Sequence, residues 1–175
     1  MNAEGDGLDS NGLLSVSGGE VYVSGPTRGG NGALDYGTES IITGGTVIAV
    51  GSADMAENFG PSSTRGSILL SVGNQAAGAT VSITDESGTV LASYTPEKSY
   101  QSVVMSCPGL ELGKSYTLTA GSFSQTLTLD SLIYGSGMGM GGHGMGGFPG
   151  GGMGGGPGSQ GGFPGGQGGG PGRRP

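Results

Sequence analysis

The sequence predicts an all-β protein with three parts: right-handed parallel β-helix coils, a small antiparallel β-sandwich-like cap, and a disordered glycine-rich tail. Three observations support this prediction. Residues 8–25 recur in similar form as residues 34–51, short runs that alternate apolar and polar residues follow them, and no segment has the spacing of an amphipathic helix. The predicted boundaries are 1–65 for the coils, 66–134 for the cap and 135–175 for the tail.

The repeat has a period of 26 residues, which is typical of stacked arrays. Each copy holds two β-rich runs on either side of a Gly-Gly pair, and we expect that pair to bend the coil. An antiparallel meander that looks repetitive is the alternative. The matching positions are Leu8/Leu34, Asp9/Asp35, Gly18/Gly44, Gly19/Gly45, Val21/Val47 and Gly25/Gly51.

Alternation along the second run of each copy predicts which side chains face the interior. We expect the inward residues to be Val21, Val23, Val47 and Ala49. Tyr22 and Ile48 are then expected to face outward.

Six further runs of strand character follow, separated by turn residues. They are 67–72, 80–85, 89–94, 101–106, 115–119 and 124–129. Gly88 lies where a short hairpin loop needs a positive φ. We expect these strands to form a small sandwich-like unit that is either independent or folded onto the open end of the coil stack.

Two coils are fewer than such stacks need, and residues 1–5 look like the end of an earlier strand. We therefore expect this chain to be the C-terminal piece of a longer protein. Its other part would carry further coils and the export signal that is not visible here.

Glycine and charge are unevenly distributed along the chain. The tail holds 23 of the 44 glycines, which is a composition typical of flexible spacers. Residues 1–134 hold all 13 acidic residues and four basic ones, a difference of −9. An acidic body repels phosphate backbones, so we expect no nucleic-acid partner. Membrane insertion is not expected either, and we expect a monomer.

Two glycine-rich turns carry oxygen ligands of the kind that Ca²⁺ prefers. DGLDSNG and NGALDYG supply the candidate metal ligands Asp6, Asp9, Asn11, Asn31 and Asp35. Stacked coils would bring Asp9 above Asp35, and neighbouring carboxylates favour a bound cation. Asx-turns, in which Asp and Asn bond their own backbone, are the alternative.

The candidate carbohydrate-binding residues are Tyr22, Arg28 and Tyr36. Arg28 could also serve as the base of a calcium-dependent polysaccharide lyase, although no second catalytic group accompanies it. The single histidine, His143, lies in the tail, which argues against a Ser/His/Asp or Cys/His arrangement. We therefore expect a noncatalytic protein.

The chain resembles the bacterial carbohydrate-binding domain-containing proteins over about residues 2–147. The segments that carry the resemblance are NAEGDGLDSNG, SGGEVYVSGPTRGGNGALDYG, ITGGTVIAVGSADMAENF and YTPEKSYQSVVMSCPGLELGKSYTLTAG. The resemblance implies a secreted or cell-surface, pectate-lyase-like parallel β-helix. It also implies binding of calcium and of a plant-type polysaccharide such as pectin or cellulose, without catalysis. A structural surface stalk or adhesin fragment is a further alternative.

Overall fold

Two pairs of parallel strands contain the sequence repeat. In the computed structural model, which describes residues 1–135, Leu8 pairs with Leu34 and Val21 with Val47, each across 26 positions. The two copies of the repeat therefore stack in parallel register, and the antiparallel meander alternative is wrong. The four strands are β1 (Leu8–Ser10), β2 (Leu13–Ser24), β3 (Leu34–Tyr36) and β4 (Glu39–Gly51).

The Gly-Gly pairs do not divide these long strands, contrary to the expectation of two runs per coil. β2 and β4 continue through them with shifts of register on either side of Ser17. Gly19 and Gly45 have φ values of 80° and 87°, which glycine adopts at little cost. The pairs thus bend a continuous ladder in the manner of a β-bulge.

A five-stranded mixed sheet extends from the coils into the second half of the chain. Its order is β11-β5-β8-β4-β2, and β8 pairs antiparallel with both β4 and β5. Strands from the predicted coils and from the predicted cap therefore share one sheet. The added strands are β5 (Ser67–Gln75), β8 (Tyr100–Ser106) and β11 (Ile133–Tyr134).

The remaining strands form a four-stranded antiparallel sheet in the order β10-β9-β6-β7. The turn between β6 and β7 contains Gly88, whose φ is 85° as its loop position predicts. All six predicted strands of this half are present, with bounds that differ by three residues or fewer. The four strands are β6 (Val81–Asp85), β7 (Val90–Tyr94), β9 (Ser115–Ala120) and β10 (Phe123–Thr128).

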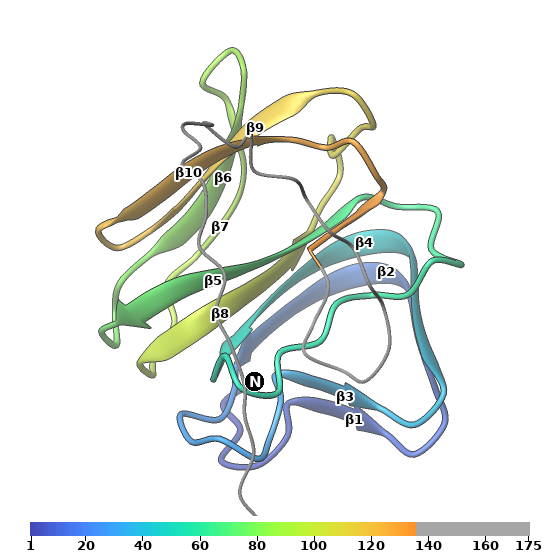
Figure 1. Ribbon diagram of the computed structural model, residues 1–175, viewed down its shortest axis with the longest axis vertical. Coiled ribbons are helices and arrows are strands. Elements are labelled where there is room, and N and C mark those ends of the chain that lie inside the picture. Colours follow the sequence, from blue (N-terminus) through green and yellow to red (C-terminus); the bar gives the residue numbers. More distant parts are fainter. Residues whose placement is uncertain (136–175) are drawn as a thin grey trace, which may run out of the picture. The chain divides into compact units, whose positions relative to one another are not determined.

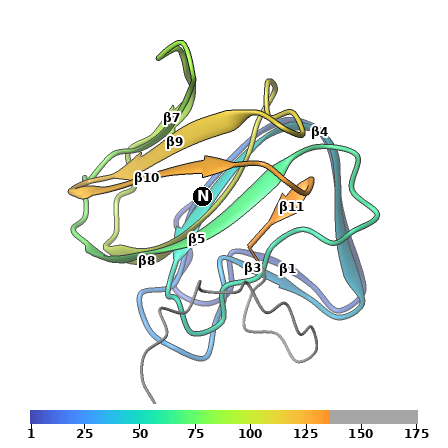
Figure 2. The same ribbon diagram turned by 45° about the horizontal axis from the view of Figure 1, so that its top comes forward.

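Three layers result, with the five-stranded sheet in the middle (Figure 1), and the turned view shows the same layering (Figure 2). One core lies between this sheet and the four-stranded sheet, and it contains Ile48, Ile83 and Leu118. A second core lies between the same sheet and the β1/β3 layer, and it contains Val47 and Leu34.

Burial on both faces of the middle sheet corrects one expectation. Val23, Val47 and Ala49 are fully buried as predicted, but Ile48, expected to face outward, is also fully buried. The four-stranded sheet covers the face that the coil pattern alone leaves exposed. Cys107 lies in the same core, and burial raises the pKa of its thiol to about 11.

The described residues are therefore all-β, with mixed and antiparallel sheets and no helix. Within residues 1–135, accordingly, no helix is long and apolar enough to span a membrane. The expected tail lies outside the described residues except for Gly135.

Gly44 and Gly18 occupy equivalent coil positions with different surroundings. A Cβ at Gly44 would lie 2.5 Å from the carbonyl oxygen of Ser17, whereas one at Gly18 would meet nothing within 4 Å. We expect Gly44→Ala to lower the free energy of unfolding by about 1–3 kcal/mol. Gly18→Ala should change it by less than about 1 kcal/mol. Urea unfolding followed by circular dichroism measures both, and equal effects would contradict the stacking.

Candidate functional site

Asp9 and Asp35 are direct neighbours in the parallel β1/β3 ladder, as predicted. Adjacent strands lie about 4.8 Å apart, so in-register side chains project from the same face at close range. Asp9 is exposed and Asp35 is half-buried. The parallel pairing of β1 and β3 thus places the two carboxylates side by side.

The other candidate ligands are Asp6, Asn11 and Asn31, and two of them accept hydrogen bonds from other segments of the chain. Asp6 accepts a hydrogen bond through Oδ1 from the Gly32 amide at 2.8 Å, which ties the two coils together. The Asn31 carbonyl accepts a hydrogen bond from Ser52 Oγ at 3.1 Å, and the Asn11 side chain is exposed. The Asp6 bond joins the two copies of the repeat and is not an Asx-turn, because its partner is 26 positions away. These contacts do not bring Asp6 or the two asparagines into one ligand set with Asp9 and Asp35.

A third acid that the sequence analysis missed, Glu57, lies beside Asp35. Its Oε2 atom is buried and has no hydrogen-bond partner among residues 1–135. Burial raises the pKa of Glu57, the Asp35 carboxylate raises it further, and a backbone hydrogen bond at Tyr36 opposes them. Within residues 1–135, however, no three or more His, Cys, Asp or Glu side chains are arranged to hold a metal ion. A cation here would need backbone carbonyls or water to complete its coordination.

Tyr22 is half-buried and stacks against Tyr94, with ring centroids 5.3 Å apart and an interplanar angle of 29°. Its hydroxyl donates to Glu20 Oε2 at 3.3 Å, and the Tyr94 hydroxyl lies 2.8 Å from Ser24 Oγ. The predicted sugar-binding ring is therefore one member of a tyrosine pair between β2 and β7. Sequence spacing gives no signal for this pair, because its members are 72 positions apart.

The other two predicted sugar-binding residues lie apart from Tyr22 in different settings. The Tyr36 hydroxyl donates to the carbonyl oxygen of Asn58 at 2.9 Å, so this end of the ring is already bonded. Arg28 is exposed in the loop between β2 and β3.

A hollow of about 210 Å³ lies next to the Arg28 loop. Gln101 is one of its lining residues. Its Nε2 atom donates to Asn74 Oδ1 at 2.6 Å, and its Oε1 atom accepts from the Ala53 amide at 3.4 Å. Its lining contains amides, hydroxyls and a tyrosine but no charged side chain. The lining residues are Thr27, Gly51, Ser52, Asn74, Gln75, Ser99, Tyr100 and Gln101.

Comparison of the sequence with family models and curated proteins, and of the fold with solved structures, found no match.

Neutralising Glu57 should stabilise the protein at neutral pH. Its raised pKa means that protonation favours the folded state, so this contribution is present below the ordinary value of 4.5 and is lost as pH rises through the raised pKa. We expect Glu57→Gln to have a higher Tm than the wild type at pH 7 in the presence of a chelator. The difference should shrink toward pH 4.5.

Thermal melts at both pH values provide the measurement. Asp54→Asn is the matched control, because it removes a carboxylate that is exposed. Equal shifts for the two variants at pH 7 would show that only total charge matters.

Proposed function

We propose that this chain is a noncatalytic polysaccharide-binding module with calcium-stabilised coils. The observation that carries the proposal is the uncharged hollow beside the Arg28 loop. Sugars present many hydroxyl groups that both donate and accept, and amide and hydroxyl side chains complement them in both senses. A few such groups in a concave site give orientation and specificity.

The same proposal includes a parallel β-helix for the repeat and a cap formed by the second half of the chain. The in-register shift of 26 residues supports coils of a right-handed parallel β-helix. Residues 66–134 act as the cap, since β8 pairs with the edge of β4 that β2 leaves free. Covering such an edge prevents uncontrolled pairing with other chains.

Calcium binding is supported by the Asp9/Asp35 pair and by Glu57, whose buried oxygen has no partner. A divalent cation near these groups would relieve the repulsion that raises the pKa of Glu57. Asp6, Asn11 and Asn31 would act on such a site through the shape of their turns.

The ligand is a plant-type polysaccharide such as pectin or cellulose, and the place of action is extracellular or at the cell surface. A lyase is the second candidate, because Arg28 is exposed and adjoins the hollow through Thr27. Lyase activity would release unsaturated products that absorb ultraviolet light. A structural stalk or adhesin would bind no glycan.

Asn74→Ala should weaken glycan binding, because it removes an amide from the rim of the hollow without disturbing a buried core. Loss of one hydrogen bond predicts an affinity lower by roughly two- to tenfold. Affinity electrophoresis in gels containing cellulose derivatives or polygalacturonate measures this effect. Asn11→Ala, which changes an exposed amide outside the hollow, is the control. Absence of retardation of the wild type by every glycan would contradict the proposal.

Calcium should raise the Tm of the wild type, since a ligand that binds only the folded state stabilises it. Asp35→Asn should abolish most of this shift, whereas Asp54→Asn should preserve it. Differential scanning calorimetry with calcium and with excess chelator provides the comparison. Identical melting of the wild type in both conditions would refute the calcium claim and leave glycan binding to be judged by its own test.

A further inference from the structure

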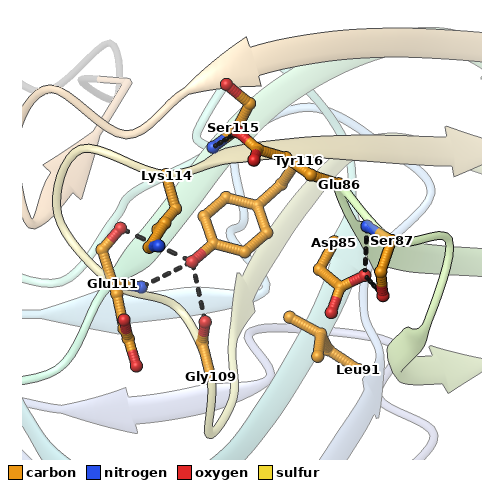
Figure 3. A pocket seen from close by; sticks show the side chains of 9 residues that line it. All are labelled: Asp85, Glu86, Ser87, Leu91, Gly109, Glu111, Lys114, Ser115 and Tyr116. Atoms are coloured by element: carbon orange, nitrogen blue, oxygen red, sulfur yellow. Dashed lines mark hydrogen bonds between the residues drawn. The ribbon is translucent and has the colours of Figure 1, made fainter.

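A larger hollow, of about 370 Å³, lies between the β6/β7 turn and the loop that joins β8 to β9 (Figure 3). It shares no lining residue with the hollow beside Arg28. Small-molecule sites begin at about this size. The lining residues are Asp85, Glu86, Ser87, Leu91, Gly109, Glu111, Lys114, Ser115 and Tyr116.

Leu91 provides the accessible apolar surface in this hollow, and it packs against the core that contains the buried Tyr116. Tyr116 is 2% exposed, and its hydroxyl donates to the Gly109 carbonyl and accepts from the Glu111 amide, both at 2.7 Å. These two bonds hold the ring in place. A Cβ at Gly109, whose φ is 92°, would lie 3.3 Å from Leu91, so glycine there leaves the leucine side chain room.

Two carboxylates on one side are oriented by backbone groups. Asp85 Oδ1 accepts hydrogen bonds from the Ser87 amide, the Ser87 hydroxyl and the Thr89 amide at 2.6–2.9 Å. The Ser87 hydroxyl contributes most to lowering the pKa of Asp85, which stays ionised. Glu86 Oε1 accepts a hydrogen bond from the Ser115 amide at 3.1 Å.

The net charge of the lining is −2, because Lys114 is its one cation against three acids. Within residues 1–135 the only ion pair is the one between Lys98 and Glu4, so Lys114 neutralises none of the acids directly. The negative charge also acts on the Tyr116 hydroxyl. Burial raises the pKa of Tyr116, and the charges of Glu111 and Asp85 raise it further, against the opposing hydrogen bond with the Glu111 backbone.

We propose that this hollow binds a positively charged sugar unit, an amino sugar with a free ammonium group. Its apolar ring face would lie on Leu91, and its ammonium would pair with the carboxylate of Glu86 or of Glu111 through charge-assisted hydrogen bonds. The inference rests on the proposed polysaccharide binding. It adds a second, negatively charged site that selects amino sugars, whereas the uncharged hollow has no charge with which to select them.

Three matched oligosaccharides test the charge preference by isothermal titration calorimetry. Oligomers of glucosamine should bind, whereas oligomers of N-acetylglucosamine and of galacturonate should bind at least about tenfold more weakly. Glu86→Gln and Glu111→Gln should each weaken glucosamine binding several-fold. Lys114→Met should strengthen it, since it removes the competing positive charge.

Asp54→Asn controls for general attraction between an acidic protein and a polycation, and it should have no effect. Circular dichroism of each variant verifies folding. The inference is overturned if Lys114→Met abolishes binding, if galacturonate oligomers bind more tightly, or if Asp54→Asn weakens glucosamine binding as much as Glu86→Gln.

The experiments can reject the proposed function and this inference independently. Neutral glycan binding that is sensitive to Asn74→Ala, together with no glucosamine binding, would leave the proposed function in place and reject this inference. Glucosamine binding that is sensitive to Glu86→Gln and insensitive to Asn74→Ala would support the inference even if the uncharged hollow binds nothing.

Discussion

The middle sheet buries side chains on both faces, and both layers around it depend on that arrangement. In β4, Val47 faces the β1/β3 layer while Ile48 faces the four-stranded sheet, and both are fully buried. Burying a Val or Ile side chain contributes about 1.5–3 kcal/mol, so consecutive residues of one strand stabilise opposite layers. A polar substitution at either position would destabilise the core on its own face of the sheet and leave the side chain on the other face in place.

Parallel register gives the coils a second property beyond packing. Because equivalent residues stack at the strand spacing, a polar residue repeated in the sequence becomes a column in space. Asp9 and Asp35 form such a column, and Glu57 joins it from a segment outside the repeat. Burial raises the pKa of Glu57 and the Asp35 carboxylate raises it further, so the ionised form of Glu57 opposes folding.

Much of this fold could be predicted from sequence patterns, because alternation and period report directly on local geometry. The 26-residue repeat predicted the pairing of Asp9 with Asp35, and turn residues predicted the strands of the second half. Ile48 lies on the face opposite Val47 as predicted, but its exposure was predicted wrongly, because what covers a strand depends on segments distant in sequence. Glu57 and the Tyr22/Tyr94 pair were missed for the same reason, since no spacing relates their partners. The two hollows likewise depend on how loops from distant strands meet.

The free edge of β2 has a consequence for the order in which the molecule opens. Among residues 1–135, β2 pairs along one edge with β4. Residues 1–3 bond along the end of its other edge, to Tyr22 and Ser24, and they are also tied to Glu97 and Lys98 by hydrogen bonds from the Asn2 and Lys98 side chains. Near Gly18, in contrast, no described atom lies within 4 Å of a Cβ position. Within the described residues, the part of β2 around Gly18 therefore has a partner on one side, whereas β4 lies between β2 and β8. Amides around Gly18 should accordingly exchange hydrogen before those of β4.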